Sequence, residues 1–262
     1  MLIKYDYLKL YFLTSKKEAG SVKNPKIKVL NLEETKKLID CGKIDAMVVF
    51  ADTYNAELFD WDLYTKTLKV PYRVGLSISS ISSFFSVIPY SYTRRIYPNE
   101  KVAMGDHILA FEKLGFKFNK EIEFYFTKES EEYAEKFLKQ HKIKKNERII
   151  FMHPTSKKTV ECIKERKQAH KDWPYQRWTE LANLLIKTYN ARIVFTGAPE
   201  ESFVIREIVS KVENKKKVID TSGKLSIEQI ASLLKRADLL ISLDSAMAHV
   251  CAQTNTPVIV LL

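Results

Sequence analysis

The stretch 237–262, ADLLISLDSAMAHVCAQTNTPVIVLL, contains two short apolar runs separated by a mixed segment. The runs 239–243 and 257–262 have the length and composition of buried parallel strands. The segment 244–254 between them has the length of a helix that crosses from one parallel strand to the next. The stretch therefore predicts a strand, turn, helix and strand unit, which indicates an α/β protein with a parallel sheet.

The turn inside this unit has the features of an anion site. Asp244 stands where the first strand ends and the helix is expected to begin. The first helical residues expose backbone N–H groups at the positive end of the helix dipole, which suits a phosphate: Ser245, Ala246 and Met247. His249 follows Ser245 by four residues, on the same helix face. A structural explanation also fits, with Asp244 as an ordinary N-cap and His249 as a buried core histidine.

Length and composition indicate a globular protein without a membrane span. The chain has 262 residues, 45% of them hydrophobic and 29% charged, which suits one large or two ordinary domains. No run of about 18 apolar residues occurs, and the first residues lack the features of a signal peptide. The three cysteines, Cys41, Cys162 and Cys251, are too widely spaced for a disulfide framework or a zinc site. We expect reduced thiols and a cytoplasmic location.

The charge balance indicates an anionic partner without identifying it. Lys and Arg number 43 against 32 Asp and Glu, a net charge of +11, so nucleic acid, an anionic membrane surface and a phosphorylated substrate are all candidates. The basic residues are spread along the chain, and no nucleic-acid-binding motif accompanies them. The closest pair among the seven glycines, Gly105 and Gly115, is ten residues apart, which excludes GxGxxG and GxxxxGK[ST] loops. A nucleotide would have to be held by helix N-termini, hydroxyl groups and lysines.

The first half of the chain alternates apolar and amphipathic segments, as expected for a parallel sheet with crossing helices. Strands are expected at 8–14, 28–31, 45–51 and 72–76, and helices at 33–40, 102–114 and 128–140. The serine-rich segment 77–86 is expected to be a loop. A charged stretch, 141–148, follows the last helix. We place a boundary near residue 146 and expect domains 1–146 and 147–262.

The second half repeats the strand and helix alternation four times. Strands are expected at 148–152, 191–196, 218–220 and in the opening stretch, and helices from Pro174, at 200–212 and at 226–235, the last with a Ser226 and Gln229 capping box. The segment 154–172 is expected to be a long loop. Such sheets bind ligands outside the carboxyl ends of their strands. The loops after Met152, Thr196, Asp220 and Leu243 are therefore the candidate binding loops.

These loops contain the residues with suitable chemistry. Thr155, Ser156 and Lys171 offer two hydroxyl groups and a cation for a diphosphate. Glu228, in the first turn of its helix, could accept hydrogen bonds from ribose hydroxyls, although favourable placement in the helix dipole explains it equally. His153 and His170 have no carboxylate or cysteine at ligand spacing, so a metal site is not favoured. The remaining lysines of the loop are explained as solvated charges: Lys157, Lys158, Lys164 and Lys167.

Several motifs in a fixed order closely resemble the family 9 glycosyltransferases, the bacterial ADP-heptose:lipopolysaccharide heptosyltransferases. They are HPTS (153–156), HKDWP (170–174), FTGAPEE (195–201), GKLSIEQIASLLKRADLLISLDSAMAH (223–249) and TPVIVLL (256–262). The resemblance covers essentially all of the second expected domain. The first half resembles the family more loosely, through its strand pattern and KVPYRVGL at 69–76.

The resemblance implies a GT-B fold, in which two Rossmann-like domains face a cleft and the second holds the nucleotide sugar. It implies transfer of a heptose from ADP-heptose to the lipopolysaccharide inner core, with inversion and without a metal or other cofactor. Lys171 would neutralise the departing diphosphate, which Thr155 and Ser156 would contact. Glu228 would bind the ribose and Asp244 the sugar hydroxyls. The amides of Ser245, Ala246 and Met247 would hold phosphate, supported by His249.

The sequence departs from the family pattern in three places. Ala246 stands where the family usually has glycine, so close approach of a phosphate is less favourable. The family begins with a strand and a Gly-Asp turn whose aspartate is the proposed general base, and Asp6 of this chain is no substitute. The family continues beyond the position of Leu262. These departures indicate a family 9 sequence truncated at both ends, with both domains incomplete and with little or no transferase activity.

Two other functions stay open. One is a non-catalytic protein that docks on anionic lipid or nucleic acid, which would bind polyanions in a strongly salt-dependent way and ignore ADP sugars. The other is a GT-B enzyme with a different nucleotide-sugar donor. The positive charge suits peripheral contact with the inner membrane surface and a phosphorylated lipid acceptor.

Overall fold

A computed structural model describes residues 9–13, 27–51, 66, 69–77, 94–96, 124–164 and 173–261. The chain divides into two compact units, Met1–Glu121 and Ile122–Leu262. Helix α5 (Lys128–Gln140) belongs to the second unit, because it packs against α9 (Ile227–Leu234). This division therefore differs from the boundary expected near residue 146, which placed α5 in the first domain.

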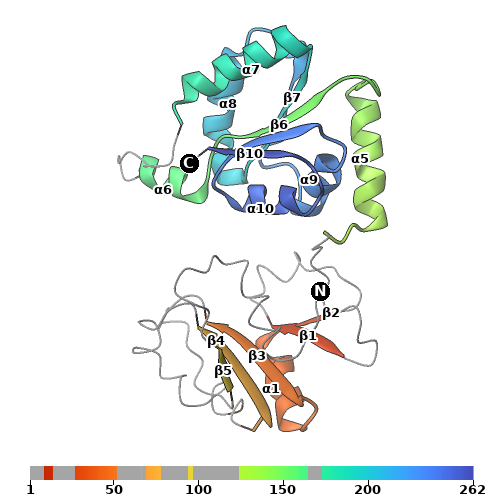
Figure 1. The fold of residues 1–262 in the computed structure, drawn as a ribbon, viewed down its shortest axis with the longest axis vertical. Coiled ribbons are helices and arrows are strands. Elements are labelled where there is room, and N and C mark those ends of the chain that lie inside the picture. The colour runs from red at the N-terminus through yellow and green to blue at the C-terminus, as the bar shows by residue number, and fades with distance from the viewer. Residues whose placement is uncertain are drawn as a thin grey trace. The chain divides into compact units, whose positions relative to one another are not determined.

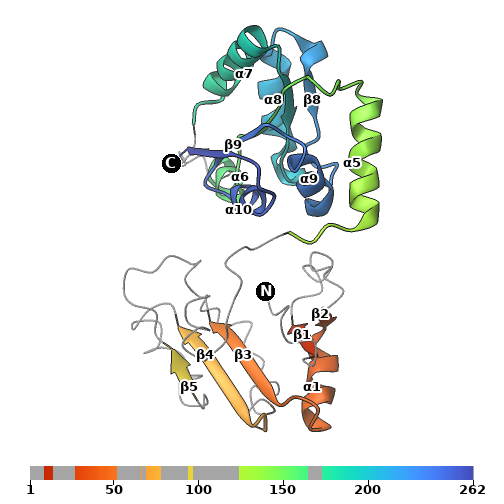
Figure 2. The ribbon, with the colours of Figure 1, turned by 45° about the vertical axis from the view of Figure 1, so that its right-hand side comes forward.

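The described part of the first unit consists of a two-stranded and a three-stranded parallel sheet and one helix (Figures 1 and 2). One pair is β1 (Leu10–Leu13) with β2 (Ile27–Leu30), and a second sheet has the order β3 (Ala46–Ala51), β4 (Tyr72–Ser77), β5 (Arg94–Ile96). Helix α1 (Leu32–Asp40) begins with a capping box between Asn31 and Glu34. The expected strands are confirmed to within two residues, whereas β5 was not predicted. The expected helix 102–114 and the loop segment 78–86 lie outside the described residues.

The second unit is built on a sheet of five parallel strands in the order β10-β9-β6-β7-β8. The strands are β6 (Ile149–His153), β7 (Arg192–Phe195), β8 (Val218–Asp220), β9 (Leu239–Leu243) and β10 (Val258–Leu261). Counted along the chain, this is the order 5-4-1-2-3, which is the doubly wound arrangement of Rossmann-type sheets. The first and fourth strands are neighbours, with His153 paired to Ser242. The topological switch point therefore lies between β6 and β9.

Helices cover both faces of this sheet. Helices α7 (Tyr175–Tyr189) and α8 (Ser202–Lys211) pack on one face, and α5, α9 and α10 (Ala246–Ala252) pack on the other (Figure 1). Short elements complete the unit: α6 (Lys157–Lys164) and the 3-10 helices η5 (Pro199–Glu201) and η6 (Lys215–Lys217). The central strand β6 is buried at all five positions, as its continuous apolar run predicted. The strand expected at 257–262 is not buried as predicted, because β10 is an edge strand whose Ile259 and Val260 are exposed.

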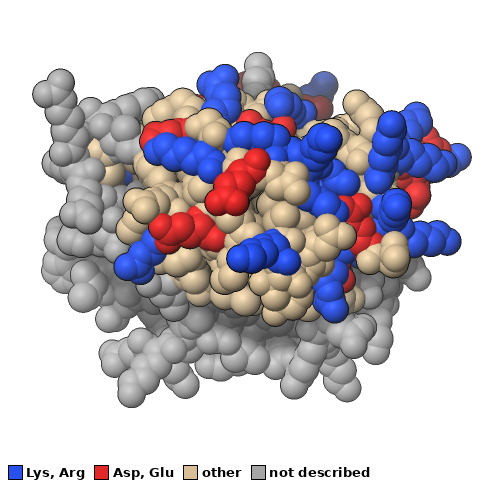
Figure 3. All heavy atoms as spheres, turned by 90° about the horizontal axis from the view of Figure 1, so that it is seen from above, with Lys and Arg blue, Asp and Glu red and all other residues tan. Residues whose placement is uncertain are grey.

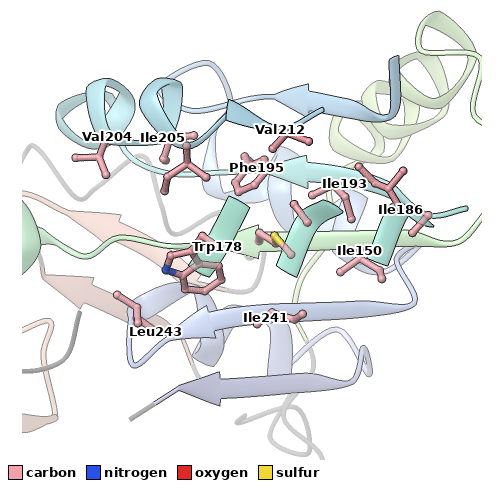
Figure 4. Close-up of a cluster of buried hydrophobic side chains, with 14 residues drawn as sticks. Ile150, Trp178, Ile186, Ile193, Phe195, Val204, Ile205, Val212, Ile241 and Leu243 are labelled. Carbon is pink, nitrogen blue, oxygen red and sulfur yellow. The ribbon is translucent and has the colours of Figure 1, made fainter. Parts of the chain in front are cut away.

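The larger of the two clusters of buried apolar side chains lies between the sheet and helices α7 and α8 (Figure 4). Trp178 of α7 is fully buried among side chains of β6, β7 and β9, and Trp173 meets it edge-on with ring centroids 5.2 Å apart. Aromatic pairs in this geometry add stability beyond the area that they bury. Trp178 is thus the main anchor of this helix layer.

Three expectations about the second unit need correction. The segment 154–172 is not a continuous loop, because α6 occupies its first part. The helix expected over 244–254 is shorter, since Ser245 is extended (φ −148°, ψ 167°) and helical geometry begins at Ala246. Pro174 is the N-cap of α7 and not its first helical residue. In the described residues, no helix has the length and apolar character needed to cross a bilayer.

Candidate functional site

The candidate site lies at the carboxyl edge of the five-stranded sheet. Parallel strands end at the same edge, so the loops that follow β6, β7, β8 and β9 converge there. The switch point between β6 and β9 opens onto this edge. All of the predicted site residues that the structure describes lie in these loops or in the first turns that follow them: Thr155, Ser156, Glu228, Asp244, Ser245, Ala246, Met247 and His249. Lys171 lies outside the described residues.

The loop after β6 presents its two hydroxyl groups differently. Thr155 is fully buried, and its Oγ1 has no hydrogen-bond partner among the described residues. Ser156 caps α6: its Oγ lies 3.3 Å from the Thr159 amide and 3.1 Å from Thr159 Oγ1, while the Ser156 amide donates to Thr159 Oγ1 at 3.0 Å. A serine hydroxyl can still use its remaining lone pair. Helix α6 begins directly after this loop, so its N-terminus lies at the same edge of the sheet.

The loop after β8 is fixed by its own side chains. Asp220 Oδ1 accepts hydrogen bonds from the amide and the hydroxyl of Ser222, at 2.9 and 2.6 Å, and Thr221 Oγ1 donates to the Phe195 carbonyl at 2.8 Å. The predicted capping box is confirmed, since Ser226 and Gln229 exchange bonds of 3.3 and 2.9 Å. These contacts hold the first turn of α9 in place. Glu228 in that turn is buried, with 8% of its surface exposed.

In the loop after β9, Asp244 is not an N-cap and His249 is not a core histidine, so the purely structural explanation of these two residues is wrong. Asp244 is exposed and precedes the N-cap, which is Ser245, and His249 is exposed on α10 and not buried in the core. Ser245 Oγ lies 3.1 Å from Ser242 Oγ, which itself donates to the Leu243 carbonyl at 2.7 Å. Asp244 and His249 are therefore exposed side chains at the carboxyl edge of the sheet and do not belong to the core.

Three buried polar residues at this edge were not predicted as site residues. His153 ends β6, Thr196 follows β7, and Glu201 ends η5, and each is at most 6% exposed. Burial lowers the pKa of His153, although the nearby Glu201 carboxylate and a hydrogen bond with the Thr196 backbone oppose the shift. His153 and Glu201 are about 48 residues apart in the sequence, so no local sequence signal could have shown that they lie near each other.

The chemistry of the edge suits a polar, phosphorylated ligand. It provides hydroxyl groups, the carboxylates of Glu228 and Asp244, and helix N-termini, which together recognise hydroxyls and phosphates. Among the described residues, no group of three or more His, Cys, Asp and Glu is placed to hold a metal ion.

The opposite, amino edge of the sheet is strongly basic. The loops and helix ends there include Lys139, Lys142, Lys144, Lys145, Arg148, Lys215 and Lys216, all of them exposed, which we call the amino-edge basic surface. Figure 3 shows Lys and Arg side chains at the right of this unit, the side on which Figure 1 shows α5, and also over the rest of the described surface. Four of its cations line a pocket of about 580 Å³, together with Arg236 and nearby carboxylates. Much of the positive charge of this unit is thus separated from the candidate site.

Comparison with known proteins identifies the family of this chain. The model of glycosyltransferase family 9 (heptosyltransferase) matches residues 63–262. The lipopolysaccharide core heptosyltransferase OpsX of Haemophilus influenzae is 32% identical over 94 residues, which are 35% of this chain and 26% of that protein. The matched segment therefore spans about a quarter of that curated relative.

Solved structures show the same fold at low identity. The family 9 glycosyltransferase of Veillonella parvula superposes with a TM-score of 0.70 at 17% identity, over 95% of this chain and 70% of that one. ADP-heptose lipopolysaccharide heptosyltransferase II of Escherichia coli gives 0.69 at 14% identity, over 98% and 76%. The E. coli heptosyltransferase WaaC with ADP gives 0.59 at 18% identity, over 98% and 78%. The α/β fold with parallel sheets is that of the heptosyltransferases.

Proposed function

The chain belongs to glycosyltransferase family 9, and from this we propose that it transfers a heptose from ADP-heptose to the lipopolysaccharide inner core. The observation that carries the proposal is the convergence of eight of the nine predicted donor-site residues at the carboxyl edge of a doubly wound sheet. The name of the H. influenzae relative supports the acceptor, and the E. coli structure with ADP supports the nucleotide.

In this proposal the protein has a GT-B architecture. Each of the two units is a Rossmann-like domain, with the acceptor bound by the first and the donor by the second. Transfer inverts the anomeric carbon and needs no metal. The enzyme works in the cytoplasm and contacts the inner membrane surface, where its lipid-linked acceptor is found. The doubly wound order of the second sheet supports the donor half of this assignment.

The roles that we propose for the donor-site residues are those that the resemblance to the family implies. Glu228, buried in the first turn of α9, accepts hydrogen bonds from the ribose. Thr155 and Ser156 contact the diphosphate beside the N-terminus of α6, and the exposed Asp244 binds sugar hydroxyls. The amides of residues 245–247 hold phosphate, and His249 supports that turn. Lys171 neutralises the departing ADP, because charge that develops on a leaving diphosphate is stabilised best by a fixed cation.

We expect ADP and ADP-heptose to raise the melting temperature of the purified chain, and UDP and GDP to have little effect. A ligand at 100 times its Kd adds about 2.7 kcal/mol to the stability of the native state. Differential scanning fluorimetry measures the shift, with Asp244→Ala and Lys171→Ala as site variants. Glu213→Ala, an exposed change at the amino edge, is the control and should keep the full shift. Equal shifts with all three nucleoside diphosphates, or none with ADP, would contradict the proposal.

A second function, docking on an anionic lipid surface, is favoured by the amino-edge basic surface. Clustered lysines near an anionic membrane contribute about 1 kcal/mol each. We expect the chain to sediment with vesicles that contain 30% phosphatidylglycerol and not with neutral vesicles, and to be released by 0.5 M salt. Replacing Lys144, Lys145 and Arg148 together by Glu should abolish sedimentation. Replacing Lys157 and Lys158 by Glu should not. Binding that survives the triple change would refute this role.

A further inference from the structure

The loops after β7 and β8 are joined to each other beyond the ends of their strands. The regular pairing of β7 with β8 stops at Phe195 and Asp220. The Phe195 carbonyl then accepts hydrogen bonds from both the amide and the hydroxyl of Thr221, at 2.9 and 2.8 Å. The Gly197 carbonyl accepts one from the Gly223 amide at 2.9 Å. We call these bonds the loop junction, and a displacement of either loop has to break or strain them.

Gly223 is the residue at which the loop junction is tightest. It occupies the third position of a turn that closes with a bond of 3.0 Å from the Lys224 amide to the Thr221 carbonyl. Its φ is +70°, and a positive φ at this position of a turn selects glycine. A Cβ added to Gly223 would also stand 2.8 Å from Ser202 Oγ and 3.0 Å from Pro199 Cα. Both the conformation and the approach of the loop after β7 therefore require glycine.

The loop after β7 is packed just as closely on its other side. A Cβ on Gly197 would stand 2.4 Å from Ile205 Cδ1 and 2.9 Å from Glu201 Oε2. Glu201 is 5% exposed, and its Oε2 accepts a hydrogen bond from a backbone amide of the same loop at 2.7 Å. Pro199 is the first residue of η5, which Glu201 ends. The backbone that Gly223 approaches thus belongs to a segment with little room to yield.

The loop junction lies close to the start of α9. Two residues separate Gly223 from Ser226, the N-cap of this helix. The first turn has little apolar packing of its own, since Ile227 is 45% exposed and the buried apolar residues of the helix begin at Ile230. The position of Glu228 in that turn therefore depends on the chain that leads into the helix.

We propose that Gly223 is a positioning residue for the nucleotide: by holding the loop junction closed, it sets the first turn of α9 and presents the Glu228 carboxylate to the ribose. The inference rests on the proposed function, in which Glu228 binds the ribose. Gly223 acts through the start of the helix and not through a contact with the donor. A shift of this turn affects the ribose contact and leaves the phosphate-binding loops after β6 and β9 in place.

The test compares two glycines that both have a positive φ. Gly223→Ala introduces the strain of that φ together with the contacts to Ser202 and Pro199. Gly42→Ala is the matched control, because Gly42 has a φ of +63° but no atom within 4 Å of an added Cβ, and it lies in the first unit. Thr221→Val is a milder change, which removes one hydroxyl bond of the loop junction and keeps the size of the side chain.

The measured quantity is the preference for ADP over 2′,3′-dideoxy-ADP, which lacks both ribose hydroxyls. Titration calorimetry gives the two affinities, and circular dichroism shows whether each variant is folded. We expect the unmodified chain to bind ADP about tenfold more tightly, because hydrogen bonds to a carboxylate are of the strong, charge-assisted kind. Equal affinity for the two nucleotides would show that Glu228 does not bind the ribose, and would overturn the inference while ADP binding stands.

Gly223→Ala should lower this preference to about twofold or less, as Glu228→Ala should. Combining the two changes should lower it no further, because both remove the same contact. Thr221→Val should lower it in the same direction, and Gly42→Ala should leave it unchanged. An unchanged preference in Gly223→Ala, or in Thr221→Val if Gly223→Ala does not fold, would overturn the inference. An equal loss in Gly42→Ala would do the same.

If the unmodified chain does not bind ADP, the proposed function fails, and hydrogen exchange still decides about the loop junction. The amides of Gln229 and Ile230 donate to the Ser226 hydroxyl and carbonyl. They should exchange about tenfold faster in Gly223→Ala and at the unmodified rate in Gly42→Ala. No acceleration at these amides, or the same acceleration throughout the second unit, would show that Gly223 does not set the start of α9.

Discussion

Replacement of Trp178 by Ala is expected to destabilise the second unit by about 3–5 kcal/mol, the usual cost of removing a large buried aromatic side chain. Trp178 is fully buried between α7 and three strands, and its loss also removes the edge-on contact with Trp173. The cavity cannot close easily, because its other walls belong to the sheet. Urea denaturation of the purified chain, followed by circular dichroism, measures the change.

Trp178→Phe is the informative comparison. The indole Nε1 has no hydrogen-bond partner among the described residues, so Phe removes an unpaired buried donor and keeps most of the ring. We expect this variant to lose roughly 1–2 kcal/mol, less than half the effect of Ala. Equal losses in the two variants would show that the indole nitrogen has an essential partner.

Replacement of Glu147 by Ala is expected to cost roughly 2–3 kcal/mol at pH 7, because it leaves two largely buried cations without their carboxylate. Glu147 Oε1 accepts hydrogen bonds from Lys217 Nζ at 2.7 Å and Arg192 Nε at 3.2 Å. The three side chains are 8%, 19% and 14% exposed. The ion pairs of Glu147 with Arg192 and Lys217 link the loop before β6 to the starts of β7 and β8. The effect is measured by comparing the urea denaturation midpoint of Glu147→Ala with that of Glu213→Ala. Glu213 is an exposed glutamate at the same edge.

The same carboxylate gives the stability a defined pH dependence. Burial alone would raise the pKa of Glu147, but the hydrogen bonds from Lys217 and Arg192 outweigh it and the pKa is lowered. A lowered folded-state pKa means that the stabilisation is complete above the unfolded-state value of about 4.3 and is lost as the pH falls through the folded-state pKa. The stability difference between the unmodified chain and Glu147→Ala should therefore be constant from pH 8 to 6 and shrink in acid. A difference that persists undiminished at pH 2 would contradict this account.

The sheet of the second unit was predictable because its signals are local. The apolar run 239–243 is flanked by charged residues on both sides, and β9 has these bounds. The capping box of Ser226 and Gln229 likewise fixed the start of α9 to one residue. Both predictions depend on residues within one turn or one strand, where sequence and structure are linked directly.

Helix α6 was missed because its cap is unusual and its charges mislead. The residue three after Ser156 is Thr159, which caps through a hydroxyl in place of the Glu or Gln of the usual pattern. Lysines at 157, 158 and 164 suggested a solvated loop. The interaction of His153 with Glu201 was missed for a different reason, since it forms only when β6 and β7 lie side by side. A tertiary contact of this kind leaves no periodic pattern in the sequence.

The strand order 5-4-1-2-3 also bears on how the protein is made. During synthesis β6 can pair with β7 soon after both have left the ribosome, but its other neighbour, β9, is encoded roughly 90 residues later. At the usual elongation rate of about 5–20 residues per second, the second edge of the central strand stays open for about 5–20 s. The unpaired backbone groups of that edge belong to a strand with apolar residues such as Ile150 and Met152. An exposed edge of this kind can pair with other chains. The nascent chain should therefore be most prone to aggregation, and most dependent on a chaperone, just before Leu239 emerges.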